Sequence, residues 1–442
     1  MRMLLATLAV LTATALGVGC YNLDVEKPGD GGASDSDTDI DTDVDSDTDS
    51  DADTDTDTDT DTDTDTDTGA YCDPGWAGLS CEICVRFVDP TAPPEGDWLS
   101  WSTAGHRIHE AIELAGQAVI DDVAEICEVW VHHGTYYIWE GDDTNSLSLA
   151  PNVHVYGGFD GTELERDGRD FWNNVTILSG HAAFETAQVY HVVHGQDDSV
   201  IDGFTIEGGV ADGSGSDGQG GGMLNMDATP TVRNCIFTNN FALSGGGAVY
   251  NDGVSPSFTN CFFYDNQTDA SGGAMGNDHS SPYIVNTVFE NNSAGLGGDA
   301  ILNWSNTSET PSNPVIVNCT FYGHTVALTN DDQSMPNVIN TIFFNNDTDI
   351  DDNGLGAEVT YSLVDESITG TGNISGNPLF CDGPGCDFRL QSGSPCIDAG
   401  FYGPNVLDYD HDGNPRVDDT SVTDTGDGSI TYVDIGAYER QV

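Results

Sequence analysis

The sequence has few positively charged residues and no long apolar segment. Only 10 of its 442 residues are Lys or Arg, against 75 Asp and Glu, so the formal charge is −65. Binding to nucleic acid or to anionic lipid headgroups requires clustered Lys and Arg, and this balance argues against both. No apolar run reaches the roughly 18 residues that a membrane-spanning helix needs. Instead the chain has 53 Gly and 37% hydrophobic residues, which is typical of a turn-rich β protein.

The first twenty residues have the features of an export sequence. Arg2 precedes an apolar segment, residues 4–16, that is followed by Gly17-Val-Gly-Cys20. Small residues before a cysteine resemble the lipobox of bacterial lipoproteins, in which that cysteine is acylated and becomes the new N-terminus. The resemblance implies lipidation at Cys20 and attachment to the cell envelope or outer membrane; plain secretion is the alternative. Both imply an oxidising compartment, where disulfides persist.

An acidic linker follows. From Ser34 to Thr68, Asp occupies every second position and mostly alternates with Thr. Such a segment repels itself and has no apolar surface to bury, so we predict that it is disordered and extended. At about 3.1 Å per residue it spans on the order of 100 Å. We interpret it as a stalk; a calcium-binding tract is the alternative.

The cysteines predict disulfides. Cys72 and Cys81 enclose a Gly-Trp-x-Gly turn, and this spacing resembles the last disulfide loop of an EGF-like module. Cys84 is a candidate partner for Cys127. Without Cys20, the 11 cysteines leave ten, an even number that permits complete pairing.

Internal repeats define the centre of the chain. Three segments that begin at Pro230, Pro256 and Pro282 align without a gap at a period of 26 residues. A fixed period of this size indicates a solenoid. Apolar residues alternate on both sides of a repeated Asn, which predicts two short strands joined by a bend in the left-handed conformation. Stacked coils then place like residues in columns, with Asn amides bonding along the axis. The predicted columns are Asn234/Asn260/Asn286, Asn225/Asn251/Asn277/Asn303, Val232/Phe258/Ile284, Cys235/Cys261/Thr287 and Phe237/Phe263/Phe289.

The repeats predict an all-β parallel β-helix. One segment, His106 to Gln117, has helical spacing and is expected to cap the solenoid. The expected strands before the repeats are Val129–Val131, Val153–Tyr156, Val175–Leu178, Val189–Val193 and Ile201–Ile206.

Two motifs extend this interpretation by resemblance. Gly-Gly-Ala at 246–248 and 272–274 alternates with Phe-x-x-Asn at 237–240 and 263–266. This resembles the GGAI and FxxN repeats of chlamydial polymorphic outer-membrane proteins and, more broadly, bacterial right-handed parallel β-helix surface proteins with a pectin-lyase-like fold. The C-terminal sequence, including Gly393-Ser-Pro-Cys-Ile-Asp-Ala-Gly400, resembles a choice-of-anchor-type end segment. The resemblances imply a right-handed solenoid with a role in adhesion or binding at the cell surface.

The chain therefore divides into six expected parts. They are a signal peptide (1–20), a disordered linker (21–69), an EGF-like fragment (70–84), an N-terminal cap with the first coils (85–199), the 26-residue repeats (200–346) and the last coils with a C-terminal cap (347–442).

A candidate calcium loop lies in the last part. Oxygen ligands alternate along residues 408–414, with Gly413 at the sixth position and Asp419 at the twelfth. An acidic turn in which Arg416 pairs with a carboxylate is the alternative. Nearby, Cys381 and Cys386 are expected to close a small loop. The predicted ligands are Asp408, Asp410, Asp412, Asn414 and Asp419.

The sequence contains only incomplete versions of known catalytic motifs. Asp197-Asp198 resembles the paired-Asp motif of polygalacturonase-like hydrolases, but the other motifs of that family are missing from the sequence, which favours a solvated turn. His191 and His194 lie three apart in an expected strand, and so point to opposite faces. The adjacent pair His132-His133 is also expected to diverge. A lyase would need a basic residue beside acidic metal ligands, and Arg233 does not recur in its column.

We therefore predict no catalytic residues and a non-enzymatic component of the cell surface, either an adhesion or binding protein or a structural one. The expected partners are a surface glycan or a protein, the membrane is contacted through the N-terminal lipid alone, and calcium is the one expected cofactor. The alternative is a carbohydrate-active enzyme, either a polysaccharide lyase or a glycoside hydrolase.

Overall fold

The computed structural model describes residues 76–77, 83–93, 96–183, 186–305, 309–365, 367–381 and 388–442. The expected signal peptide and linker lie outside these residues, as do Cys20, Cys72, Cys81 and Cys386. Among the helices of the described chain, none has the length and apolar character needed to cross a membrane.

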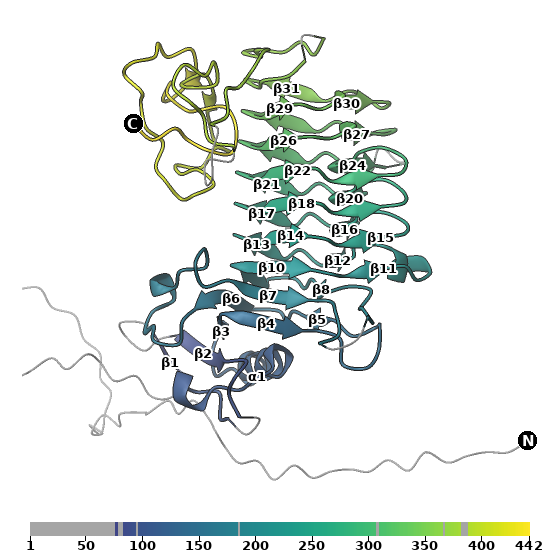
Figure 1. Cartoon of the computed structure of the whole chain (residues 1–442), viewed down its shortest axis with the longest axis vertical. Coiled ribbons are helices and arrows are strands. Elements are labelled where there is room, and N and C mark those ends of the chain that lie inside the picture. Colours follow the sequence, from purple (N-terminus) through teal and green to yellow (C-terminus); the bar gives the residue numbers. More distant parts are fainter. Residues whose placement is uncertain are drawn as a thin grey trace, which may run out of the picture. The chain divides into compact units, whose positions relative to one another are not determined.

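The described chain winds into stacked coils, and each coil adds one short strand to each of several parallel sheets (Figure 1). Strands in successive coils pair in parallel, for example β13 with β17 and β14 with β18. This is the predicted parallel β-helix, in its right-handed form. One 11-stranded sheet, two eight-stranded sheets and one four-stranded sheet enclose the core.

The 11-stranded sheet is called sheet A. Its strands are β1 (Trp76–Ala77), β2 (Ile83–Val88), β3 (Cys127–His132), β6 (Val153–Phe159), β9 (Val200–Asp202), β13 (Thr231–Arg233), β17 (Ser257–Thr259), β21 (Tyr283–Val285), β25 (Val315–Val317), β28 (Asn337–Ile339) and β31 (Glu358–Thr360).

Two eight-stranded sheets, B and C, complete most of each coil. Sheet B contains β4 (Gly134–Tyr137), β7 (Thr176–Ser179), β10 (Phe204–Glu207), β14 (Ile236–Thr238), β18 (Phe262–Tyr264), β22 (Val288–Glu290), β26 (Thr320–Tyr322) and β29 (Ile342–Phe344). Sheet C contains β5 (Leu147–Ser148), β8 (Val193–His194), β12 (Met223–Met226), β16 (Val249–Asp252), β20 (Met275–Asp278), β24 (Ile301–Trp304), β27 (Val326–Asn330) and β30 (Thr348–Asp352).

The remaining elements are short. The four-stranded sheet contains β11 (Val210–Ala211), β15 (Phe241–Ala242), β19 (Gln267–Thr268) and β23 (Ser293–Ala294), and a two-stranded sheet contains β32 (Phe401–Tyr402) and β33 (Asp427–Gly428). The helices are α1 (Ile108–Ile120) and the 3-10 turns η1 (Trp101–Thr103), η2 (Arg166–Gly168) and η3 (Gly215–Gly218).

The bend between sheets A and B carries the predicted asparagine column. Asn234, Asn260 and Asn286 have φ values of 49°, 54° and 50°, in the left-handed region that Asn tolerates. The Asn260 amide donates a hydrogen bond to the Asn234 side-chain oxygen, and Asn286 donates to Asn260, each at 3.2 Å. The prediction that these residues form one file along the axis is confirmed.

Inside the coils, phenylalanine rings form a continuous stack. Phe237 lies 4.7 Å from Phe263, and Phe263 lies 5.0 Å from Phe289, as measured between ring centroids. All three side chains are completely buried, as are Val232 and Cys235 of the neighbouring columns. The predicted alternation of inward and outward residues around the bend is therefore confirmed.

A second asparagine ladder runs through sheet C. The Asn251 amide donates to the Asn277 side-chain oxygen at 2.8 Å, and the Asn277 amide donates to Asn303 at 2.9 Å. Because Asn277 is 1% exposed, its two neighbours in the ladder have little access to water as an alternative partner.

Replacing Asn277 by alanine should lower the free energy of unfolding by about 2–4 kcal/mol, because one donor and one acceptor stay buried without a partner. Chemical denaturation of purified protein measures this change. Asn353→Ala, at an exposed position, is the matched control and should change stability by less than about 0.5 kcal/mol. Equal effects of the two substitutions would show that the ladder contributes nothing to stability.

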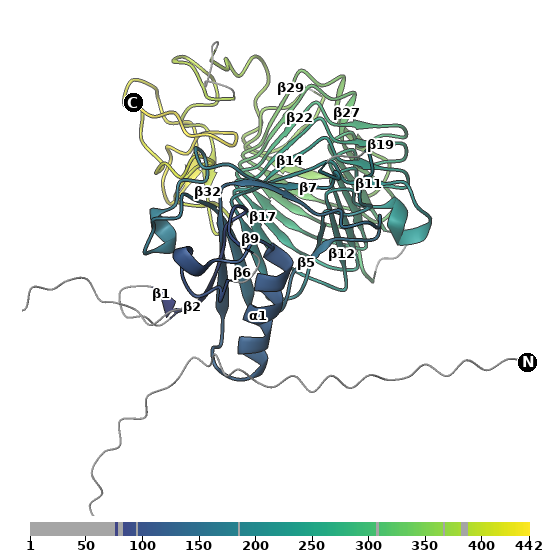
Figure 2. The same cartoon turned by 60° about the horizontal axis from the view of Figure 1, so that its bottom comes forward.

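The predicted cap is the helix α1. Its apolar residues Ile108, Ala111, Ile112 and Ala115 are buried against the core of the first coils. Figure 2 brings this end of the β-helix to the front. The helix extends three residues beyond the predicted end at Gln117.

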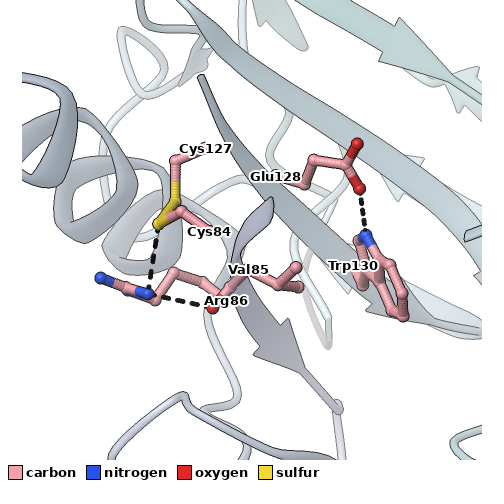
Figure 3. Close-up of a disulfide and its surroundings, with 6 residues drawn as sticks. All are labelled: Cys84, Val85, Arg86, Cys127, Glu128 and Trp130. Carbon is pink, nitrogen blue, oxygen red and sulfur yellow. Dashed lines mark hydrogen bonds between the residues drawn. A yellow bond between two sulfur atoms is a disulfide. The ribbon is translucent and has the colours of Figure 1, made fainter. Parts of the chain in front are cut away.

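The predicted disulfide between Cys84 and Cys127 is confirmed, and it joins the neighbouring strands β2 and β3 (Figure 3). Complete pairing does not occur, because four cysteines among the described residues are free and buried. Within the described coils the thiols fill apolar positions, and burial raises the pKa of Cys235 to about 12. The free cysteines are Cys235, Cys261, Cys319 and Cys396.

Two expected strands differ from the structure. The segment 201–206 was expected as one strand, but Gly203, at φ 84°, bends it into β9 and β10 on different sheets. Of the segment 189–193, Val193 alone belongs to a strand, which continues through His194. Short strands on either side of a bend leave the same alternating pattern as one longer strand, which explains the first difference.

The C-terminal segment, residues 388–442, packs along the side of the coils (Figure 1). Its contacts reach successive rungs of the asparagine column: Asn286 donates to the Tyr409 carbonyl, Asn318 to the Asp434 carbonyl and Asn340 to the Phe401 carbonyl. Sequence analysis predicted a cap here without predicting this lateral attachment.

Candidate ligand-binding face of sheet A

The outer face of sheet A brings together polar side chains from separate coils. Side chains alternate along each strand, so every second residue points away from the core. On β3, Cys127 points inward to its disulfide while Glu128 and Trp130 lie on the other side of the strand (Figure 3). The strand register extends these positions into two outer columns. They are Glu128/His154/Val200/Thr231/Ser257 and Trp130/Tyr156/Asp202/Arg233/Thr259.

Both carboxylates of the two columns given above are already paired. Arg166 contacts the Glu128 carboxylate at 3.1 Å, and the indole of Trp130 donates to the same carboxylate at 2.6 Å. Arg169 contacts Asp202 at 2.7 Å, and both of these side chains are more than nine-tenths buried. The two arginines come from the connection between β6 and β7, so the cluster holds that connection against the sheet.

Tyr156 lies in the middle of this cluster. The guanidinium carbons of Arg166 and Arg169 lie 5.1 Å and 5.0 Å from the centre of its ring, within the range of cation–π attraction. Burial raises the pKa of Tyr156, and it also raises the pKa of Glu128 despite the opposing effects of Trp130 and Arg166. Burial, aided by the nearby positive charge of Arg233, lowers the pKa of His154, so this imidazole is neutral at pH 7.

Arg233 differs from the other arginines. It is exposed, and no carboxylate of the described chain lies within ion-pair distance of it. The hydroxyl residues Thr231, Ser257 and Thr259 are half-buried beside it on β13 and β17. One free positive charge among hydroxyl groups can bind an anionic or polyhydroxylated ligand. The arginines with ion-pair partners are Arg107, Arg166, Arg169, Arg389, Arg416 and Arg440.

The C-terminal segment covers the next part of the same face. Tyr283, one coil beyond Ser257, donates its hydroxyl to the Asn405 carbonyl at 2.6 Å. Val285 packs with Val406 and Val433 of that segment in one apolar cluster. The uncovered part of the face therefore lies between this segment and the arginine cluster.

Asp197 and Asp198 form a turn, which is the interpretation that the sequence analysis favoured. Asp197 accepts hydrogen bonds from the backbone and hydroxyl of Thr229, and Asp198 has a φ of 54°. Hydrogen bonding to Thr229 lowers the pKa of Asp197, which suits a structural carboxylate rather than a general acid.

The sequence predicted that the two rings of each histidine pair point away from each other, and the structure instead places them close together. The rings of His191 and His194 lie 5.0 Å apart, because β8 begins at Val193 and the alternation of a strand does not apply to His191. The rings of His132 and His133 lie 4.2 Å apart, since β3 ends at His132. Among the described residues, no third ligand-type side chain joins either pair in a metal-sized group.

The predicted calcium loop uses its carboxylates in other contacts. Asp410 accepts the backbone amides of Asp412, Asn414 and Glu439. Asp412 pairs with Arg389. Asp419 accepts hydrogen bonds from Arg440 and Ser421. Asp408 accepts a hydrogen bond from the Tyr402 hydroxyl. Arg416 pairs with Glu439, in agreement with the acidic-turn alternative. In the described part of the chain these five ligands are not gathered around one point.

A different acidic group does converge nearby. One carboxylate oxygen from each of Asp398, Asp418 and Asp424 lies within 4.8 Å of the others. Asp398 is buried, and burial together with nearby carboxylates raises its pKa to about 6. This triad is able to hold a metal such as calcium. Sequence analysis missed it because its members are up to 26 residues apart and follow no loop pattern.

Cys381 is disulfide-bonded, and its predicted pairing with Cys386 stays a prediction because Cys386 lies outside the described residues. A separate hollow of about 900 Å³ lies beneath α1. Its Arg107 pairs with Glu110 and Glu140, so this hollow offers less free charge than the sheet A face.

Two of the three solved structures compared below are named as carbohydrate-active enzymes. Pectate lyase Pel9A is 11% identical with a TM-score of 0.40, and the match covers 81% of this chain and 98% of that chain. The Escherichia coli protein ybhc is 13% identical with a TM-score of 0.35 and coverage of 62% and 72%. The A-module of the Azotobacter vinelandii mannuronan C-5 epimerase AlgE4 is 13% identical with a TM-score of 0.27 and coverage of 65% and 76%. No family model and no curated protein matches the sequence. The likeness concerns the parallel β-helix fold alone.

Proposed function

We propose that this protein is a non-enzymatic, cell-surface β-helix protein that binds an acidic glycan on the outer face of sheet A. The observation that carries the proposal is the exposed, unpaired guanidinium of Arg233 among Thr231, Ser257 and Thr259. Guanidinium groups bind carboxylate and sulfate groups through charge-assisted hydrogen bonds, and the hydroxyl side chains suit the hydroxyls of sugars.

Binding is favoured over catalysis by the state of Glu128 and Asp202, the two carboxylates of the columns that contain Thr231 and Arg233. Glycoside hydrolysis uses a pair of carboxyl groups free to exchange protons or attack the sugar. Glu128 and Asp202 are instead buried and paired with Arg166 and Arg169. Their arrangement stabilises the sheet and leaves Arg233 as the available charge.

The proposal places the β-helix outside the cell, attached through lipid at Cys20 and separated from the membrane by the stalk of residues 21–69. The disulfide between Cys84 and Cys127 supports an exported protein, because such bonds persist in oxidising compartments.

Substituting Arg233 by alanine should weaken binding to an acidic polysaccharide by about tenfold to a hundredfold, the loss expected for one charge-assisted hydrogen-bonding group. The measurement is calorimetric titration of the full chain with polyuronates and sulfated glycans, chosen from a binding panel. Arg233→Lys should retain part of the affinity, and the affinity should fall as salt is raised.

Arg107→Ala is the matched control, because it removes an ion-paired arginine beside α1, away from β13. The same panel is monitored for new reducing ends and unsaturated sugars. Their appearance would replace the proposal with the enzyme alternative. Equal binding by wild type and Arg233→Ala, or binding of a protein partner alone, would remove the sheet A face as a glycan site.

A further inference from the structure

The acidic triad of the C-terminal segment consists of Asp398, Asp418 and Asp424. Asp398 precedes β32, whereas Asp418 and Asp424 belong to the connection that leads to β33. Oxygen atoms of the three carboxylates lie within 4.8 Å of one another. Like charges at this separation repel each other strongly unless a cation or protons intervene.

Asp398 makes the triad more than a surface cluster. Its side chain is 0% exposed, and neither carboxylate oxygen has a hydrogen-bond partner. The backbone amide of Asp419 is near enough to favour the ionised form without making a hydrogen bond of acceptable geometry. Buried polar groups without partners are rare and costly, so this orphaned carboxylate indicates a missing ligand.

Among the residues that the structure describes, no nearby arginine serves as the counter-ion. The Arg440 side chain bonds to Asp419, and Arg416 pairs with Glu439. The negative charge of the three carboxylates is therefore uncompensated, and a small positive ion would neutralise it.

We infer that Asp398, Asp418 and Asp424 bind a calcium ion. Three carboxylates with no nitrogen or sulfur donor are the ligand set of a hard divalent cation. The exposure of Asp418 and Asp424 leaves room for water molecules, which complete the six to eight oxygen ligands typical of calcium. Magnesium is expected to bind more weakly, because it requires a stricter octahedral geometry.

The ion would join two parts of the C-terminal segment beside the point where that segment is attached to the β-helix. The Asp398 backbone carbonyl accepts the amides of Thr425 and Gly426, which hold the two parts of the site together. Three residues further on, Phe401 exchanges two hydrogen bonds of 2.7 Å with Asn340, the rung of the asparagine column beside the last coils. Binding at the triad therefore stabilises the segment that covers part of sheet A.

The test is a calcium titration of the metal-free full chain, followed by calorimetry and by thermal unfolding. Wild type should show saturable binding and a melting temperature that rises with calcium concentration, as expected for a ligand of the native state. Asp398→Asn should lose most of this shift. Asp424→Asn, at an exposed position, should weaken binding at least tenfold.

Asp408→Asn is the matched control, because it removes a carboxylate from the predicted calcium loop and leaves the triad intact. It should retain wild-type binding. Any calcium bound by the alternating Asp residues of 34–68 is common to every variant, so the comparison rests on the difference between Asp398→Asn and wild type. The inference is overturned if calcium gives no melting shift, if both triad variants behave as wild type, or if Asp408→Asn alone abolishes binding.

Discussion

Replacing Phe263 by alanine should lower the free energy of unfolding by about 3–5 kcal/mol, as expected for a large-to-small change in a rigid core. The ring is completely buried and stacks on Phe237 and Phe289 at 4.7 Å and 5.0 Å, with Phe258 6.0 Å away. Hydrogen bonds along sheets A and B fix the spacing of the coils, so the neighbouring rings have little freedom to fill the cavity. Chemical denaturation measures the change.

Tyr264→Ala is the matched control, because Tyr264 is the next residue after Phe263 on β18 and is half-buried on the outer face. It should cost clearly less than Phe263→Ala. In a solenoid the effect should also be local, because each coil contacts its neighbours alone. Hydrogen exchange should therefore increase most in the coils on either side of Phe263. Similar losses for the two variants would contradict a rigid aromatic column.

The repeated part of the fold was predictable because each repeat carries the same local information. Asn260 both tolerates the left-handed bend and bonds to Asn234 in the coil below, so one residue type at one spacing determines the bend and the stacking. The helix α1 was predictable for a similar reason, since its apolar face follows from residues three and four apart.

The candidate site was less predictable because its residues lie outside the repeat. Glu128, Tyr156 and Asp202 meet through the register of β3, β6 and β9, which no sequence period marks. The partners of Glu128 and Asp202, Arg166 and Arg169, come from a connection between strands. Arg233 was identified from the sequence, but its lack of an ion pair depends on where the other side chains lie.

The lateral attachment of the C-terminal segment depends on contacts across more than 100 residues. The Arg416 guanidinium bonds to the Asn286 side-chain oxygen at 3.1 Å, across 130 residues of sequence, and pairs with Glu439 at 3.0 Å. The sequence predicted that Arg416 pairs with a carboxylate, as an alternative to a calcium loop, but did not identify that carboxylate. The partner is Glu439, 23 residues further along the chain, and local patterns do not report such pairs.

Arg416→Met is expected to destabilise the protein by about 3–5 kcal/mol, the cost of leaving a buried charge without its partner. The side chains of Arg416 and Glu439 are 2% and 0% exposed, so water cannot replace the guanidinium. Because Arg416 also bonds to Asn286, the C-terminal segment should separate from the coils first. Denaturation measures the stability, and hydrogen exchange of residues 400–442 measures the separation.

Arg389→Met is the matched control, because its pair with Asp412 is partly exposed and should contribute only about 0–1 kcal/mol. The double variant Arg416→Met, Glu439→Gln should recover much of the lost stability, since it removes the uncompensated charge along with its partner. A double variant as unstable as Arg416→Met would show that packing, rather than charge, explains the loss.

The pH dependence of Arg416→Met separates these explanations further. Burial raises the pKa of Glu439 in the native protein even though Arg416 opposes the shift, so removing Arg416 should raise this pKa more. A carboxyl group whose native pKa lies above its unfolded value, about 4.3, destabilises the fold increasingly as pH rises between the two values. The difference in stability between Arg416→Met and wild type should therefore be small near pH 4 and largest above the raised pKa. A difference independent of pH would contradict an electrostatic origin and assign the effect of Arg416 to its packing and its hydrogen bond with Asn286.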